Sequence, residues 1–184
     1  MNYNGMLKEG SLEGKVILIT GGGTGLGKSM GKYFMELGAN IIITSRKQDI
    51  LDKTAEEFSK YPSKVLPISG DVRDHKDVKR VISESLNEFG KIDCLLNNAA
   101  GNFISPTEKL TTKAFDVVID IVLKGTYNYS LLLGQQWIEN KISITLKPIK
   151  DKFEDSAPST TRSIAFNLYN FLGTMLTADF QDDI

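Results

Sequence analysis

The stretch 15-KVILITGGGTGLGKS-29 runs from a row of aliphatic and β-branched residues straight into five glycines within residues 21–27. Such an apolar run indicates a buried strand. A glycine-rich turn that follows a strand and opens a helix points backbone N–H groups and the positive end of the helix at an anion. We therefore expect a phosphate or pyrophosphate to bind at this turn, the alternative being a turn that binds nothing.

Two phosphate-binding patterns compete for these residues, because G-x-G-x-x-G fits the turn in no register. One is T-G-x-x-x-G-x-G over residues 20–27, in which the glycines allow ligand and helix to approach closely. The other is the P-loop pattern G-x-x-x-x-G-K-S over residues 22–29, in which Lys28 reaches the phosphates and Ser29 holds magnesium. The turn by itself favours neither pattern.

Beyond the turn, apolar runs alternate with segments of helical length. The expected strands are residues 15–20, 40–45, 64–70 and 91–98, and the expected helices between them are residues 28–38, 50–61 and 74–90. Parallel strands joined by right-handed crossovers form a doubly wound sheet that binds ligands at the carboxyl ends of its strands. The fold class is therefore α/β, with a Rossmann-type doubly wound parallel sheet.

Two more helices are expected after the fourth strand. Residues 105-SPTE-108 match a capping box with proline in the first turn, which predicts the start of a short helix. Residues 113–140 predict one long, largely buried helix, because their apolar residues are too dense for a single stripe. Gly125 within it indicates close packing against a neighbour such as a partner subunit.

Composition limits the classes of function. The 184 residues carry a formal net charge of −1, which argues against a nucleic-acid binder. No stretch approaches the roughly 18 apolar residues of a membrane span. The only cysteine, Cys94, precludes an internal disulfide, and no cluster of residues has metal-ligand spacing. We expect small-molecule or protein partners, no metal, no membrane and a cytoplasmic location.

Four motifs at the ends of expected strands decide between the two phosphate-binding patterns. They are TGGGTGLG at 20–27, SR at 45–46, DVRD at 71–74 and NNAAGNFISPTE at 97–108. Together they resemble the short-chain dehydrogenase/reductase family, and within it the NADPH-dependent 2,4-dienoyl-CoA reductases of fatty-acid β-oxidation. The resemblance covers roughly residues 10 to 140. It favours this family over a P-loop, which predicts none of the later motifs.

The resemblance implies a set of cofactor-binding residues. They are Gly21, Gly23, Thr24, Gly25, Leu26, Gly27, Ser45, Arg46, Asp71, Val72, Asn98, Ala99, Ala100 and Gly101. A guanidinium at Arg46 suits a ribose 2′-phosphate, which favours NADPH over NADH, the alternative being a surface arginine. Asp71 is implied to accept from the adenine amino group, the alternative being an aspartate that only caps a helix. Asn98 to Ala100 are implied to contact the ribose and support the sheet.

The resemblance also implies substrate contacts, for an acyl-CoA thioester. Arg73 matches an arginine that binds a CoA phosphate, and Asn102 matches an asparagine that donates a hydrogen bond to the thioester carbonyl. Phe103 is implied to pack on the acyl chain. Thr111 is a weaker candidate, and ordinary loop residues are the alternative for all four. The only histidine, His75, is expected to be a solvated side chain.

The family's catalytic pair of a tyrosine and a lysine four residues later is missing. None of the six tyrosines in the sequence precedes a lysine at that spacing, so no catalytic residue is predicted. Ser143 and Lys147 match a Ser-x-x-x-Lys variant formally, but their β-branched surroundings come too early for the catalytic helix. We interpret that match as chance.

The resemblance stops after Lys141. We divide the sequence into an N-terminal extension at 1–12, an NAD(P)-binding domain at 13–141 and an atypical tail at 142–184. The expectation is a sheet truncated after the fourth or fifth strand and a chain that is inactive as written. The family suggests a homo-oligomer. The alternative function is a non-catalytic nucleotide-binding or partner-binding fragment from a frameshifted, fused or alternatively ended gene.

Overall fold

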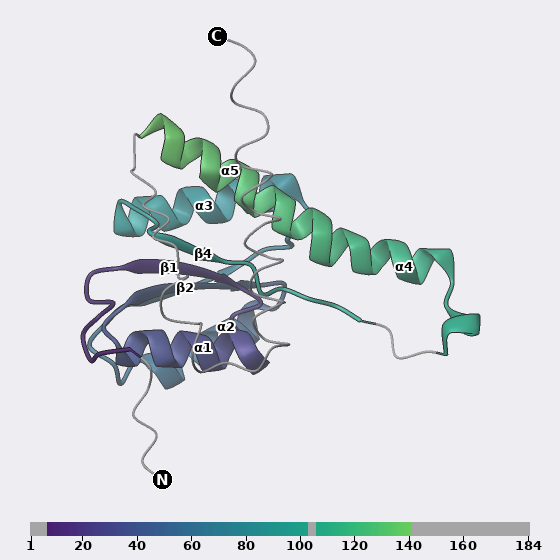
Figure 1. The fold of residues 1–184 in the computed structure, drawn as a ribbon. Coiled ribbons are helices and arrows are strands. Elements are labelled where there is room, and N and C mark those ends of the chain that lie inside the picture. Colours follow the sequence, from purple (N-terminus) through teal and green to yellow (C-terminus); the bar gives the residue numbers. More distant parts are fainter. Residues whose placement is uncertain (1–6, 103–105, 141–184) are drawn as a thin grey trace, which may run out of the picture. The chain divides into compact units, whose positions relative to one another are not determined.

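The computed structural model describes residues 7–102 and 106–140 of the chain. Four parallel strands form one sheet, in the order β3-β2-β1-β4 (Figure 1). Along the chain, the first elements are β1 (Val16–Thr20), α1 (Gly25–Glu36), β2 (Asn40–Ser45), α2 (Gln48–Phe58) and β3 (Val65–Ser69). They are followed by α3 (His75–Phe89), β4 (Cys94–Leu96), η1 (Thr107–Lys109), α4 (Thr112–Ile119), η2 (Asp120–Lys124) and α5 (Gly125–Glu139). The predicted α/β fold with a parallel sheet is confirmed.

The central strand β1 is buried on both faces. Its first four residues, Val16 to Ile19, are each at most 4% exposed, as an unbroken apolar strand in a parallel sheet requires. β1 pairs with β2 from Val16 opposite Asn40 to Thr20 opposite Thr44, and with β4 from Ile17 opposite Cys94. This register brings the carboxyl ends of the strands to one edge of the sheet.

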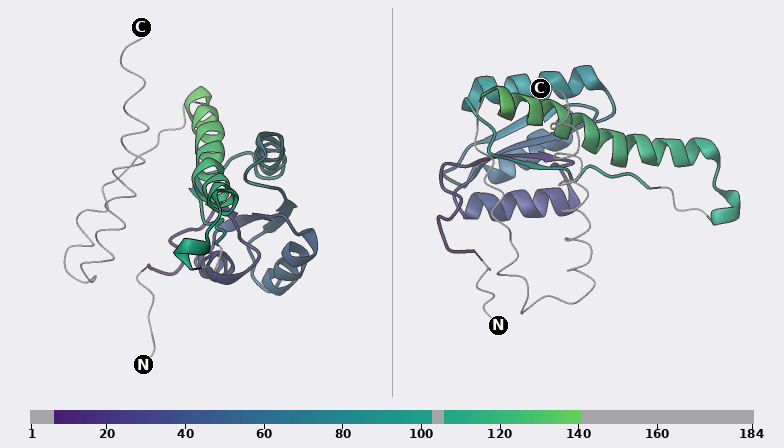
Figure 2. Two further views of the ribbon diagram at one scale, coloured as in Figure 1. Left: turned by 90° about the vertical axis from the view of Figure 1, so that its right-hand side faces the viewer. Right: turned by 45° about the horizontal axis from the view of Figure 1, so that its top comes forward.

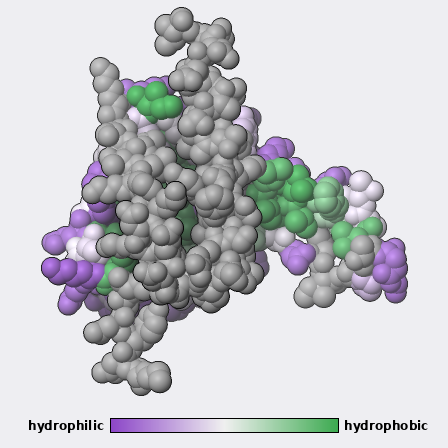
Figure 3. All heavy atoms as spheres, viewed as in Figure 1, coloured by the Kyte–Doolittle hydropathy of each residue, from purple (hydrophilic) through white to green (hydrophobic). Residues whose placement is uncertain are grey.

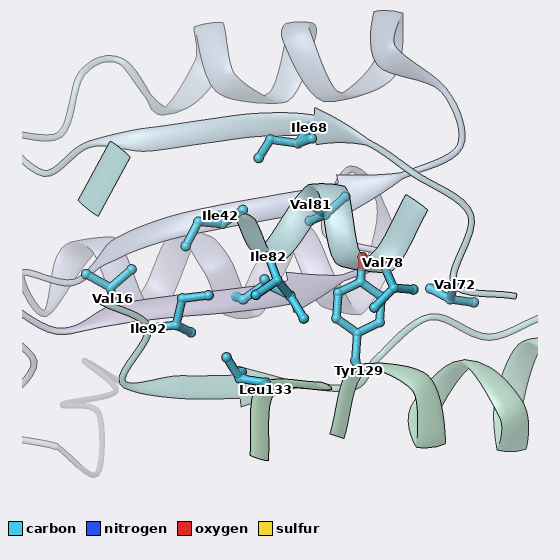
Figure 4. Packing of buried hydrophobic residues seen from close by; sticks show 11 residues of the cluster. Val16, Ile42, Ile68, Val72, Val78, Val81, Ile82, Ile92, Tyr129 and Leu133 are labelled. Carbon is cyan, nitrogen blue, oxygen red and sulfur yellow. The ribbon is translucent and has the colours of Figure 1, made fainter. Parts of the chain in front are cut away.

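Helices cover the two faces of the sheet. The views in Figures 1 and 2 place α1 and α2 on one face and α3 and α5 on the other. The core is correspondingly divided into two clusters. Ile17, Ile19 and Ile41 pack with Met35 of α1 and Leu51 of α2. On the opposite face, α3 and α5 contribute the residues that Figure 4 shows around Tyr129, namely Val78, Val81, Ile82 and Leu133, which pack on Leu18 and Ile42.

Helix α3 starts and stops where the sequence predicts. The Asp74 carboxylate accepts a hydrogen bond from Lys76 N–H at 2.8 Å, which satisfies one of the unpaired donors at the helix start. At the other end Gly90 adopts a φ of 71°, the left-handed conformation that favours glycine. His75 is the first residue of the helix and is exposed, as expected for a solvated side chain.

The long helix predicted over residues 113–140 differs from expectation in two ways. Helices α4 and α5 are joined through η2, a π-helical turn, so the helix is interrupted in its middle. The prediction that it is largely buried is wrong. Its apolar residues face solvent as well as the sheet, because they surround the helix while only one side of α5 packs on α3 and the sheet. The exposed ones are Phe115, Ile119, Val122, Leu123, Tyr127, Leu131 and Ile138.

Figure 3 shows part of this apolar surface over α4, where the helix extends past the sheet. Gly125, where the sequence predicted close packing against a neighbour such as a partner subunit, packs closely against Val72 of the same chain. A Cβ atom added there would lie 2.5 Å from Cγ2 of Val72, so glycine allows α5 to approach the loop after β3. The close approach at Gly125 is therefore an intrachain contact.

Several predicted features lie outside the described residues. They include Ser105 of the capping box, Phe103 and the tail from residue 141 onward. The short helix predicted at the capping box is present as a single turn of 3₁₀ helix, Thr107–Lys109. No helix within residues 7–102 and 106–140 has the length and apolar character needed to cross a bilayer.

Candidate functional site

The glycine turn between β1 and α1 adopts a backbone that glycine makes possible. Gly21 and Gly25 have φ angles of 67° and 54°, in the left-handed region where a side chain is strained. Residue 27 must be glycine for a different reason, namely lack of space. A Cβ atom there would lie 2.4 Å from the Gly21 carbonyl oxygen and 2.5 Å from Nδ2 of Asn98, closer than real contacts allow.

The start of α1 is left open for a ligand. The N-cap residue, Thr24, makes no side-chain cap hydrogen bond, and the first turn contains no acidic residue. The first N–H groups of a helix have no intrahelical partner, and together they carry partial positive charge. An anion at this turn would satisfy donors that no side-chain cap takes, so the described residues fit a phosphate group.

A clamp of hydrogen bonds ties the end of β4 to the end of β1. Thr20 Oγ1 accepts from the N–H groups of Asn98 and Ala99, at 3.0 and 2.9 Å. The Asn98 amide returns two bonds, from Nδ2 to the carbonyl oxygens of Thr20 at 3.0 Å and Gly21 at 3.3 Å. Asn98 therefore holds the glycine turn against the end of β1.

A cavity of about 240 Å³ opens at this edge of the sheet. Nine residues proposed from sequence line it: Gly21, Gly23, Thr24, Ser45, Arg46, Asp71, Val72, Ala99 and Ala100. They come from the ends of all four strands. The topology therefore gathers residues that are far apart in the sequence, such as Gly21 and Ala100, into one hollow.

Sequence reasoning missed four lining residues, namely Lys47, Ile50, Gly70 and Ile121. Lys47 and Gly70 adjoin predicted residues and could have been found by proximity. Ile121 had no such signal. It belongs to the π-helical turn η2, and its Cδ1 lies 2.7 Å from where a Cβ atom of Gly101 would be.

The other predicted cofactor residues sit around the cavity. Gly25, Leu26 and Gly27 form the first turn of α1, where the Leu26 side chain is 76% exposed. Gly101 lies against Ile121. Of the predicted substrate residues, Asn102 is exposed after the end of β4. Thr111 has a structural role, because its Oγ1 accepts from Ala114 N–H at 3.2 Å and caps α4.

The predicted adenine and CoA residues, Asp71 and Arg73, are paired with each other. Arg73 Nε donates to Asp71 Oδ1 at 2.9 Å, Nη2 donates to Oδ2, and the Arg73 backbone N–H donates to Oδ1 at 3.0 Å. The side-chain hydrogen bond from Arg73 lowers the pKa of the Asp71 carboxyl below its ordinary value, and the more distant charge of Arg46 acts in the same direction. The carboxylate at the cavity wall is therefore firmly ionised.

Two contacts hold the Asp71 loop in place. Asp77 Oδ2 accepts from the Asp71 backbone N–H at 3.0 Å, and Asp77 is in turn held by Arg80. From α5, the buried Asn128 donates through Nδ2 to the Val72 carbonyl oxygen at 2.9 Å. Asp71 thus protrudes from a loop that both α3 and α5 anchor.

The geometry argues against the P-loop interpretation. Lys28 Nζ forms an ion pair with Glu57 of α2, with an N–O distance of 2.7 Å. A P-loop lysine reaches its phosphates from beside the glycine turn. Here the ammonium group is engaged between α1 and α2. Within residues 7–102 and 106–140, no group of His, Cys, Asp and Glu side chains is arranged to hold a metal ion.

Comparison with known proteins agrees with this geometry. A model of the short chain dehydrogenase family matches residues 15–143. A probable 2,4-dienoyl-CoA reductase of Caenorhabditis elegans, described as (3E)-enoyl-CoA-producing, is 42% identical over 146 residues, which are 78% of this chain and 47% of that protein. This chain spans about half the length of the curated relatives it matches.

Solved structures show the same relationship. A short chain dehydrogenase from Bacillus anthracis superposes with a TM-score of 0.67 at 41% identity, over 71% of this chain and 54% of the other. A 3-ketoacyl-(acyl-carrier-protein) reductase from Brucella melitensis, solved in complex with NADH, superposes with a TM-score of 0.65 at 32% identity, over 71% and 53%. The resemblance inferred from the strand-end motifs is confirmed.

Proposed function

This chain belongs to the short-chain dehydrogenase family, and from that premise we propose that it binds NADPH in the cavity at the carboxyl edge of the sheet and takes part in the reduction of a conjugated enoyl or dienoyl thioester of coenzyme A. The observation that carries the proposal is the juxtaposition of an uncapped α1 start, Arg46 and Asp71 around one hollow. The dienoyl-CoA reductase relatives support the substrate class.

Each part of the cavity fits one part of the dinucleotide. The uncapped start of α1 suits the pyrophosphate, because backbone N–H groups donate to anionic oxygens. Arg46 and Lys47 place two positive charges at the end of β2, where a ribose 2′-phosphate would lie. Asp71, as an ionised carboxylate, accepts from the purine amino group. The cationic pair favours NADPH over NADH.

The chemical step that fits this family is hydride transfer. A bound nicotinamide supplies the hydride, and the residues of this chain bind and orient the reactants. Asn102 is proposed to donate to the thioester carbonyl, which draws negative charge from the conjugated chain, and Phe103 to pack on that chain. Arg73 is proposed to bind a phosphate of coenzyme A, because a guanidinium forms charge-assisted hydrogen bonds with phosphate oxygens. Thr111 is kept as a weaker substrate contact.

A second function is supported by one observation in the sequence. None of the six tyrosines is followed four residues later by a lysine, so the family's usual proton donor is missing from these 184 residues. A chain that binds the dinucleotide without turning over a substrate fits that observation. We also propose that the chain forms a homo-oligomer, which the exposed apolar side chains of α4 and α5 support. The cytoplasmic location stays a prediction.

The deciding experiment is a fluorescence titration of the purified chain with NADPH and, separately, with NADH. We expect saturable binding that prefers NADPH. Arg46→Ala should weaken NADPH binding about ten- to hundredfold and leave NADH nearly unchanged, because charge-assisted hydrogen bonds contribute about 1.5–3 kcal/mol. Lys53→Ala, which removes an exposed cation from α2, is the matched control. Equal affinity for both nucleotides, or no binding of either, would overturn the cofactor assignment.

Turnover separates the two functions. NADPH oxidation in the presence of a 2,4-dienoyl-CoA, abolished by Asn102→Ala, would support the reductase. Saturable NADPH binding without any turnover would instead support the binding function for this polypeptide. Magnesium-ATP serves as the control ligand, since its binding would revive the P-loop interpretation.

A further inference from the structure

The Asp71 carboxylate is already engaged by a cation in this structure. Its Oδ1 accepts two bonds from Arg73, from the backbone N–H at 3.0 Å and from Nε at 2.9 Å, while Oδ2 accepts from Nη2. An ionised carboxylate offers about four lone-pair sites in all. Arg73 Nε also lies 3.1 Å from Oδ2, so three N–H groups of one neighbouring residue make four contacts with the carboxylate, two on each oxygen.

Asp71 faces the cavity in which the purine of the proposed dinucleotide would lie. The loop that carries Asp71 is held in place, because Asp77 accepts a hydrogen bond from the Asp71 backbone N–H and Asn128 donates one to the Val72 carbonyl oxygen. The Arg73 side chain is one-third exposed and can move more freely. When a second donor arrives at Asp71, the guanidinium is the group that can give way.

Arg73 has a second anionic neighbour. The charge of Asp120, at the start of the π-helical turn, attracts its guanidinium as well, although more weakly than Asp71 does. Asp120 also lies 3.8 Å from Lys124 Nζ. A guanidinium that leaves Asp71 would therefore remain on this side of the site, where an anionic ligand could recruit it.

We propose that Arg73 and the amino group of a bound purine compete for Asp71, so that binding of the dinucleotide releases Arg73 to bind a phosphate of the acyl-carrier substrate. This inference rests on the proposed function and adds a coupling between its two ligands. Arg73 acts as a positioning residue for the first ligand and a contact for the second. The dinucleotide and coenzyme A then bind cooperatively.

The competition predicts an effect of unusual sign. NADPH is strongly anionic, so loss of a nearby arginine should weaken its binding on grounds of charge alone. If Arg73 competes for Asp71, its loss should instead tighten binding, because the carboxylate becomes available to the purine. Partly exposed ion pairs contribute up to about 1 kcal/mol, so the expected tightening is about three- to fivefold.

The experiment measures NADPH and coenzyme A affinities of the full chain by calorimetric titration, each with and without the other ligand. In the wild type, saturating NADPH should tighten coenzyme A binding, and coenzyme A should tighten NADPH binding by the same factor, as linkage requires. Arg73→Gln should bind NADPH three- to fivefold more tightly, bind coenzyme A more weakly, and show no coupling. Lys79→Gln, which removes an exposed cation from α3, is the matched control and should change neither.

A purine without the amino group tests the cause directly. The reduced nicotinamide hypoxanthine dinucleotide phosphate has an oxygen at that position, so Arg73→Gln should not tighten its binding. Arg73→Lys keeps the charge but loses the bidentate geometry, so it should tighten NADPH binding by a smaller factor. This variant tests the competition if circular dichroism shows that Arg73→Gln is unfolded.

The outcomes separate the two proposals. If the wild type binds NADPH in an Arg46-dependent way but Arg73→Gln binds it equally or more weakly, the competition is overturned and the proposed function stands. Equal tightening for the hypoxanthine analogue also overturns the competition. If the wild type does not bind NADPH at all, the proposed function fails and the coupling fails with it.

Discussion

Replacing Gly27 with alanine tests whether the glycine turn exists for close backbone approach. The added Cβ would lie 2.4 Å from the Gly21 carbonyl oxygen, 2.5 Å from Asn98 Nδ2 and 3.0 Å from the Gly21 carbonyl carbon. Two of these three atoms belong to the backbone, which cannot rotate away as the end of a flexible side chain can. The turn and the Asn98 side chain must therefore both shift.

The magnitude follows from what that shift breaks. Overpacking a well-packed site costs about 1–3 kcal/mol. Displacing Asn98 also weakens its bonds to the Thr20 and Gly21 carbonyl oxygens, at about 1 kcal/mol each. Alanine recovers about 1 kcal/mol, because it is a better helix former than glycine. The expected net loss in the free energy of unfolding is about 3 kcal/mol.

Gly134→Ala is the matched control, since Gly134 is also a buried helical glycine. A Cβ atom at Gly134 would meet nothing within 4 Å, so this substitution should stabilise the chain by about 0.5–1 kcal/mol through helix propensity alone. Urea denaturation of the three proteins, followed by circular dichroism, measures both changes. NADPH titration at a temperature where each variant is folded measures the effect of each substitution on nucleotide binding at the turn.

The result that would refute the reasoning is a Gly27→Ala variant as stable as the wild type with unchanged NADPH affinity. In that case the turn has room for a side chain, and the contacts with Gly21 and Asn98 do not explain the glycine. A loss of stability at Gly134 of similar size would also refute it. Both glycines would then be required for a reason unrelated to space.

Two further predictions concern Thr20 and Asp71. Thr20→Val should lower the free energy of unfolding by about 2 kcal/mol, because the Asn98 and Ala99 N–H groups lose their acceptor; an unchanged free energy of unfolding in urea denaturation would contradict this. The Asp71 carboxyl has a pKa below its ordinary 3.8, so the Asp71–Arg73 pair contributes stability that is present above about pH 4 and lost as the pH falls through the lowered value. The stability difference between the wild type and Arg73→Gln should accordingly be constant from pH 5 to 7 and shrink below pH 4, and a difference that is unchanged at pH 2 would show that the carboxylate is not its source.

The sequence by itself was enough to predict the sheet and its ligand edge. The apolar runs of β1 and β2 are continuous because both faces of the central strands of a parallel sheet are buried. The capping by Asp74 and the left-handed Gly90 are local, since each depends on a few neighbouring residues. The glycine turn could be placed for the same reason, although the turn alone could not exclude a P-loop.

The tertiary structure decided what depends on distant contacts. It paired Lys28 with Glu57, exposed apolar side chains of α4 and α5, and identified Val72 as the neighbour that Gly125 packs against. It also brought Ile121 to the cavity through a π-helical turn that has no sequence signature. Above all it joined Asp71 to Arg73, which the sequence had assigned to separate ligands, because opposite charges two residues apart can pair once the turn after β3 brings the guanidinium to the carboxylate.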